Sequence, residues 1–222
     1  MLFRSRAADA VAAALAEGMS PEAVGEAISL ASNRLVLCDP GRVRAEPGKP
    51  VGSVHGASVG VHASDAANAW RNIARVSNRR NTLASLIVGA YHTAGQAGGL
   101  NPQPYPFAEH REKVRGRDAD ALLPDLEAAI RSNDQALACA LVDHMGTLGL
   151  PARPVFDLLL RYAISEDGSL HAEKYYRTVT EEFAAMRPAF RWRQLVALAR
   201  VTASEYGLAA PGMEEARKLL KL

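Results

Sequence analysis

The chain has 222 residues, which is enough for one large domain or two small ones. Hydrophobic residues make up 48% and charged residues 23%, as in an ordinary folded protein, and the net charge is only +2. Without a strong positive field, nucleic acid is not an expected partner. No run of apolar residues approaches the length of a membrane span, so we expect no membrane association either.

The N-terminal segment MLFRSRAADA lacks the apolar stretch of a signal peptide, and the protein is expected in the cytoplasm. Residues 1–5 also resemble a translated sequencing adapter. Their interpretation as an artefact leaves room for a partner domain upstream in the natural chain. Cys38 and Cys139 lie far apart and form no CxxC pair, so we expect two small buried residues rather than a disulfide or a zinc knuckle.

Helical signals dominate from the N-terminus onward. Ser20 followed by Pro21 is typical of an N-cap and a first helical position, and apolar residues then recur at helical spacing. Residues 39–49 hold two Pro-Gly pairs and predict a loop. The helices expected after it cover residues 54–76, 81–96, 122–132, 135–147, 152–165, 169–186 and 189–206, with a short one from Gly212. No alternating run predicts a strand, so the expected fold class is all-α, a multi-helix bundle.

Three short segments recur in the same order in the two halves of the chain. The similar pairs are 18–24 with 149–155, 52–55 with 168–171 (both GSxH), and 82–86 with 194–198. Each copy would read helix, glycine turn, helix, GSxH helix, helix. We therefore expect residues 6–222 to form a single all-helical domain. It would contain two pseudo-symmetric four-helix repeats, at about 8–96 and 135–207.

Two histidines, His55 and His62, lie seven residues apart in the stretch GSVHGASVGVHASDAANAW. On a helix over 54–76 these positions differ by roughly 20°, so both side chains would point the same way. Ile73 lies on that face and Arg71 on the opposite one. The helical wheel therefore predicts that the histidines are buried and that the polar side faces water.

Carboxylates accompany these histidines. Asp65 lies one turn from His62 and is placed to fix the tautomer of an imidazole. On the later GSxH helix, Glu182 stands beside His171, at the edge of the apolar face that contains Tyr175. If Glu182 is covered it needs a cation, a protonated histidine or a metal, and if it is not covered it is an ordinary boundary glutamate.

A metal can hold imidazoles and a carboxylate together in a helical core. The candidate ligands, for iron or zinc, are His55, His62, His171 and Glu182. The candidates for binding a cofactor or small molecule are Asp65, His92 and Tyr175. The chain contains no E-x-x-H pair of the di-iron bundles, no HExxH, no P-loop and no GxGxxG.

The stretch VHGASVGVHASDAANAWRNIAR, followed by LIVGAYHTAG and later by SEDGSLHAEKYY, resembles a histidine-bearing helical domain. That domain is associated with some Rieske-type iron–sulfur proteins and with questin-oxidase-like proteins. The likeness covers roughly residues 18–185 and implies an all-helical, oxidoreductase-type domain, although the Rieske cluster's own ligands are absent from this chain. GMSPEAVGEAISLAS is similar to a helix of carboxymuconolactone-decarboxylase-like proteins, but without the CxxC of their peroxidase branch no thiol chemistry is implied.

Two functions stay open on this basis. The first is an oxidoreductase-type helical domain with a buried His/carboxylate site that binds a metal or a small substrate. The second is a non-catalytic helical module for assembly or regulation of a partner domain, with the histidines as core residues; a homo-oligomer is compatible with either. Convergence of His55, His62 and His171 would favour the first function. Their separation by Trp70 and Tyr175 would favour the second.

Overall fold

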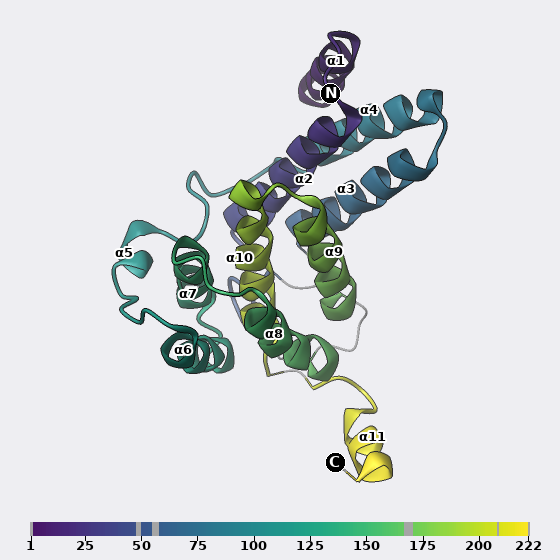
Figure 1. Ribbon diagram of the computed structural model, residues 1–222. Helices are drawn as coiled ribbons and strands as arrows, with labels where there is room; N and C mark the ends of the chain where they lie inside the picture. The colour runs from purple at the N-terminus through teal and green to yellow at the C-terminus, as the bar shows by residue number, and fades with distance from the viewer. Residues whose placement is uncertain (1, 48–49, 55–57, 167–170, 208, 222) are drawn as a thin grey trace.

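The computed structural model describes residues 2–47, 50–54, 58–166, 171–207 and 209–221. These residues form a bundle of eleven α-helices, so the expected all-α class is confirmed (Figure 1). In chain order the helices are α1 (Leu2–Ala16), α2 (Pro21–Cys38), α3 (Val59–Val76), α4 (Arg79–Gly95), α5 (Ala108–Arg111), α6 (Ala119–Arg131), α7 (Gln135–Thr147), α8 (Arg153–Ser165), α9 (Ala172–Ala185), α10 (Pro188–Glu205) and α11 (Met213–Leu220).

Serine caps mark where the N-terminal helices begin. The Oγ of Ser20 accepts a hydrogen bond from Ala23 N at 3.2 Å, which confirms the predicted start of α2. The expected helix over 54–76 is shorter than predicted, because α3 begins only at Val59. Ser58 caps it, accepting a hydrogen bond from Val61 N at 3.2 Å.

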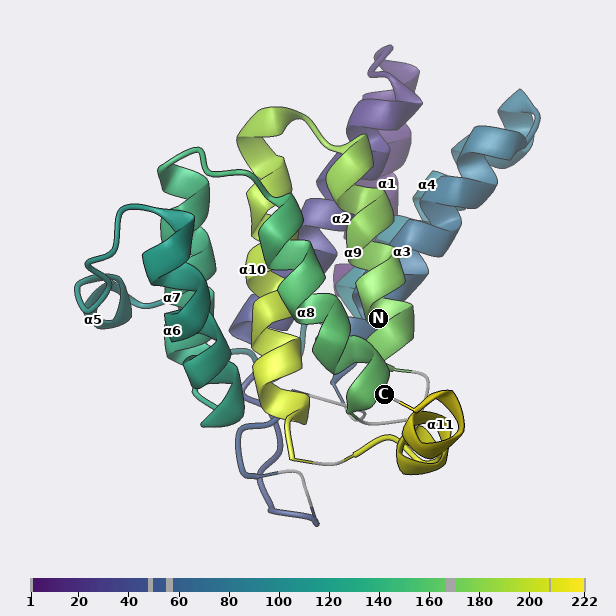
Figure 2. The ribbon, with the colours of Figure 1, turned by 60° about the horizontal axis from the view of Figure 1, so that its bottom comes forward.

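Two groups of helices meet in the bundle. In one group, α3 packs on both α2 and α4, and α1 packs on α4. In the other, α10 packs against α6, α7, α8 and α9, and its second half is buried on every side. Both views of the ribbon show α9 and α10 on the side of the second group that faces α2 and α3, and α11 set apart from both groups (Figures 1 and 2). The groups join where α9 contacts α3 and where α10 contacts α2.

The four helices α1–α4 and the four helices α7–α10 follow the proposed repeats. In each set the first and third helices pack on the fourth, and the second packs on the third. A twofold axis between the sets would also pair α4 with α8 in the way that α2 pairs with α10, and α4 and α8 share no comparable contact. The duplication therefore stays a prediction.

Both cysteines are free and buried, as expected from their spacing. Burial raises the pKa of Cys139 to about 12, so this thiol is protonated at neutral pH. Within the described part of the chain, no helix combines the length and apolarity needed to cross a membrane.

Candidate functional site: the polar seam between α3 and α9

The helix α3 turns its polar side inwards, opposite to the prediction. Its buried polar side chains, at most 7% exposed, are Ser64, Asp65, Asn68 and Arg71. The face expected to be buried is open instead: Val59 is 40% exposed, Ile73 is 44% exposed, and His62 is also exposed. The predicted burial of His62 on an apolar face is therefore wrong.

Close packing explains this inversion. A Cβ added at Gly60 would lie 2.6 Å from the backbone nitrogen of Val36, so only glycine lets α3 approach α2 so closely. The small residues that can make such contacts lie on the polar side of α3, which includes Ala63 and Ala67. The polar side chains are buried with them, and α2 and α9 supply their partners.

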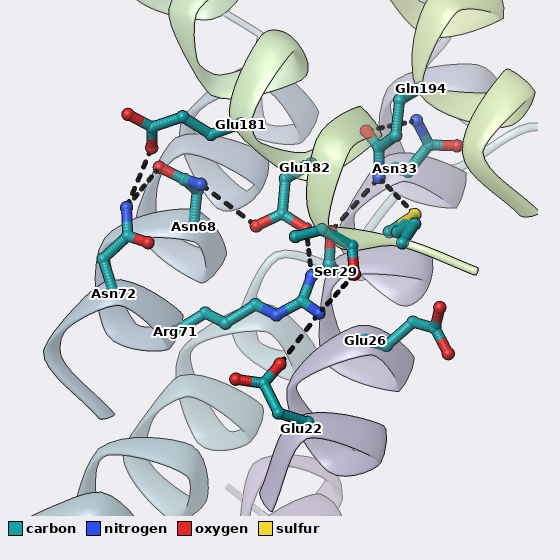
Figure 3. A network of polar contacts seen from close by, with 12 residues as sticks. Glu22, Glu26, Ser29, Asn33, Asn68, Arg71, Asn72, Glu181, Glu182 and Gln194 are labelled. Atoms are coloured by element: carbon teal, nitrogen blue, oxygen red, sulfur yellow. Dashed lines mark hydrogen bonds and ion pairs between the residues drawn. The ribbon is translucent and has the colours of Figure 1, made fainter. Parts of the chain in front are cut away.

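A buried ion pair occupies the middle of the seam between α3 and α9 (Figure 3). The Nη1 of Arg71 lies 2.6 Å from the Oε2 of Glu182, and the Nδ2 of Asn68 donates to the Oε1 of Glu182 at 3.0 Å. The side chains of Arg71 and Glu182 are 4% and 1% exposed. Glu182 is thus covered, and its partner is a cation rather than a histidine. Because both of its oxygens are engaged in this way, its expected role as a metal ligand is not supported.

The seam continues through α2. The Nη2 of Arg71 also donates a hydrogen bond to the Oε2 of Glu22 at 3.2 Å, and the Nε of Arg75 donates to the Oε1 of the same carboxylate at 3.0 Å. The hydrogen bond from Arg75 is the main reason why the pKa of Glu22 lies below its ordinary value. Glu22 is therefore ionised near neutral pH and extends the charged network to the surface.

A second set of contacts links α2 to α10. The Nδ2 of Asn33 donates to the Oε1 of Gln194 at 3.1 Å, and the Nε2 of Gln194 donates to the Oγ of Ser29 at 3.1 Å (Figure 3). One turn earlier on α2, the carboxylate of Glu26 accepts hydrogen bonds from the backbone and side chain of Arg187. Polar contacts thus join the two helical groups here, beside an apolar cluster in which Val36 of α2 and Val61 of α3 pack with residues of α6–α10.

At the other end of the seam, two histidines meet. The ring centroids of His62 on α3 and His171 at the start of α9 are 5.6 Å apart, edge to face. Below them, the Oδ1 of Asp65 accepts a hydrogen bond from the Oγ1 of Thr178 at 2.8 Å, and the Oδ2 lies 3.1 Å from the Nζ of Lys174. His62 is exposed and His171 is half-buried, so this end of the seam is open to solvent.

Tyr175 lies on the core side of this group and is 0% exposed. Burial is the main cause of its raised pKa; the negative charge of Asp65 raises it further, and the Ser64 hydroxyl lowers it slightly. The phenol therefore stays protonated, and it is sealed from any molecule at the open end. Its expected contact with a bound cofactor is not supported.

Of the remaining predicted site residues, one is outside the described part of the chain and one lies away from the seam. His55 is outside the described residues. His92 is half-buried on α4, which packs on α1, α2 and α3 rather than on α9, so the fold does not bring it to the seam. Trp70 packs against Gly89 of α4, where an added Cβ would lie 3.3 Å from it, and it does not separate His62 from His171.

Of the predicted metal ligands, the structure brings two together, His62 and His171. Across the described ranges, no group of three or more His, Cys, Asp or Glu side chains is placed to hold a metal ion. Imidazole is a ligand type that suits iron and zinc, and a metal role for His62 and His171 stays a prediction. Asp65 is the carboxylate that α3 supplies, but its Oδ1 already accepts a hydrogen bond from Thr178 and its Oδ2 already pairs with Lys174.

The sequence reasoning missed several residues of the seam. They are Ser64, Asn68, Arg71, Lys174 and Thr178. The wheel had placed the polar side of α3 in water, and Lys174 looks like any exposed lysine. One signal was present: the polar side of α3 is mixed with glycine and alanine, which is typical of closely packed helices rather than of a solvated face.

A comparison of the chain with protein-family models, with curated proteins and with solved structures finds no match.

Proposed function

We propose that the open end of the seam is the functional site of an oxidoreductase-type helical domain, where His62 and His171 bind a transition metal ion or a small substrate. The contact between these two rings carries the proposal, since it joins side chains from distant parts of the chain. With metal–nitrogen distances of about 2.0–2.1 Å, two imidazoles on one tetrahedral ion have centroids roughly 5–6 Å apart. The observed separation of 5.6 Å agrees with this spacing.

The chemistry of the surrounding groups is consistent with the proposal. Imidazole suits iron and zinc, and a neutral imidazole can also transfer a proton near neutral pH. The buried carboxylate of Asp65 would stabilise a positive charge that develops on the imidazoles or binds beside them. Lys174, whose side chain is 55% exposed, can leave Asp65 at little cost when a ligand enters.

One observation favours the alternative, a non-catalytic module for assembly or regulation of a partner domain. The two buried carboxylates of the seam are already satisfied, Asp65 by Thr178 and Lys174, and Glu182 by Arg71 and Asn68. Buried polar groups have such partners in any folded protein, so this pairing needs no catalytic role to explain it. In this case the contact between the histidines is an ordinary aromatic pair and binds no ligand.

Metal analysis separates the two functions. The full chain would be incubated with excess Zn²⁺, or anaerobically with Fe²⁺, desalted, and its metal content measured by mass spectrometry. We expect about one equivalent of metal in the unchanged protein and its loss in His62→Ala and in His171→Ala. The control is His144→Ala, because His144 lies on α7 and bonds to the carbonyl of Gly116, away from the seam.

For His62→Ala, a loss of bound metal cannot be explained by unfolding of the variant. His62 is exposed, so its removal should change the free energy of unfolding by less than about 1 kcal/mol. Metal that is retained in both seam variants, or that is absent from the folded unchanged protein after loading, would refute metal binding at this site. If no metal binds, protection of the two histidines from chemical modification by a small molecule would still support a ligand site. Without metal and without such protection, the non-catalytic module is the favoured function.

A further inference from the structure

A groove of about 580 Å³ lies between α1, α2 and α4, within the size range of sites for small molecules. It exists because α1 packs along α4 and contacts α2 only slightly. The turn between α1 and α2 contains Gly18 with a φ of +95°, a backbone conformation that glycine favours. Alanine is the commonest residue in the walls and comes from all three helices, so the space between the helices is left unfilled.

The groove has one polar end and one apolar end. Among the described residues that line it, Arg34 is the one charged side chain, and Cys38 and Thr93 are the other two with polar atoms. Arg34 and Cys38 lie near the end of α2, and the chain beyond α4 returns there, since Asn101 N donates to the carbonyl of Cys38 at 2.7 Å. The opposite end is formed by apolar residues such as Met19.

Arg34 has no hydrogen-bond or ion-pair partner within the described residues, although it is next to an apolar surface. Its charge acts on the thiol of Cys38: burial raises the pKa of that thiol, and Arg34 lowers it in part. A cation at one end of an apolar groove is complementary to a molecule with an anionic head and an apolar tail.

We propose that this groove binds a medium-chain fatty acid such as laurate, with the carboxylate at Arg34 and the chain directed towards Met19. Ala23 and Arg34 are separated along α2 by about 16 Å, which is enough for an extended acyl chain. The groove lies on another face of α2 from the seam, so the proposal does not depend on the ligand of His62 and His171. Each additional methylene that enters the groove should tighten binding, by at most about fourfold.

Calorimetric titration of the full chain with laurate tests the proposal, with dodecanol and dodecylamine as probes of the head group. We expect one laurate per chain, with dodecanol weaker by about fivefold, the value of one partly exposed ion pair, and dodecylamine weaker still. Arg34→Ala should weaken laurate by the same factor and leave dodecanol unchanged. Ala27→Phe fills the groove and should abolish binding of both.

Two matched variants control for general effects of these changes. Ala84→Phe places the same ring at an exposed position of α4 outside the groove, and Arg80→Ala removes an exposed arginine from the same helix. Both should bind laurate normally, and circular dichroism should show that every variant is folded.

Three results would overturn the proposal. Equal affinity for laurate and dodecanol, unchanged by Arg34→Ala, would mean that no head group is recognised. Laurate that fails to bind would mean that the groove is not an acyl site. A dimer that Ala27→Phe dissociates, seen by sedimentation, would mean that a second copy of the chain covers the groove.

Discussion

The buried ion pair between Arg71 and Glu182 makes a quantitative prediction about stability. The variant Arg71→Met removes the cation and leaves the carboxylate of Glu182, which is 1% exposed, with Asn68 as its remaining hydrogen-bond donor. Breaking a buried pair by removing one partner costs about 3–5 kcal/mol. Since the free energy of unfolding of a typical domain is about 5–15 kcal/mol, this variant should lose a large part of its stability.

The double variant Arg71→Met/Glu182→Leu distinguishes burial of a lone charge from loss of packing. It removes both charges and leaves Asn68 without its acceptor, which costs about 1–3 kcal/mol. Replacing a buried ion pair by apolar side chains is otherwise often neutral or stabilising by about 1–4 kcal/mol. We therefore expect the double variant to be more stable than Arg71→Met alone.

Urea denaturation followed by far-UV circular dichroism at pH 7 measures both effects. The control is Arg153→Met, which removes a cation from an ion pair of α8 whose side chains, Arg153 and Asp157, are 84% and 51% exposed. Such a pair contributes about 0–1 kcal/mol. If Arg71→Met costs no more than Arg153→Met, or if the double variant is less stable than Arg71→Met, then the pair is not buried as described.

Three further predictions concern other parts of the bundle. Gly60→Ala should lower the free energy of unfolding by about 1–3 kcal/mol, because the new Cβ would meet the backbone of α2. The control is Gly98→Ala, whose Cβ would have nothing within 4 Å and which should change the free energy of unfolding by at most about 0.5 kcal/mol. Burial of Glu26 opposes its ionisation, but hydrogen bonds from Arg187 outweigh this effect and lower the pKa of the carboxyl. The ionised carboxylate therefore stabilises the fold above pH 4.5, and this stabilisation is lost as the pH falls further. Glu26→Gln should accordingly make the free energy of unfolding less dependent on pH in that range. Cys139 should resist a thiol reagent at pH 8 in the native protein and react once guanidinium has unfolded it; reaction in the native state would contradict its burial.

Local signals made most of the helices predictable. Ser20 and Pro21 predict the start of α2, because an N-cap is a contact between residues that are neighbours in the chain. The start of α3 was predicted too early because the small residues before Ser58 continue the helical pattern without a break. Nothing in the periodicity distinguishes Ser58 as the cap from the other serines of this stretch.

The inside of α3 could not be predicted in the same way. A helical wheel assigns polar side chains to water because it contains no partners for them. Arg71 becomes a buried residue only when Glu182, more than a hundred positions later, lies opposite it. The repeated GSxH motif pairs His171 with His55, so it does not predict the contact of His171 with His62. The exposure of His62 could not be predicted either, because it depends on which side of α3 meets α2.

The two proposed sites are built on different helices, His62 on α3 and His171 at the start of α9, and the groove on α1, α2 and α4, so they can be tested independently. Glu26 and Asn33 face α10 through Arg187 and Gln194, whereas Ala27 and Arg34, each one position further along, line the groove. One position corresponds to a rotation of about 100° on a helix, so neighbouring residues of α2 face α10 in one case and the groove in the other. A substitution at Arg34 should therefore change acyl binding without removing a contact of the seam. A substitution at His62, on another helix, should change metal content without narrowing the groove.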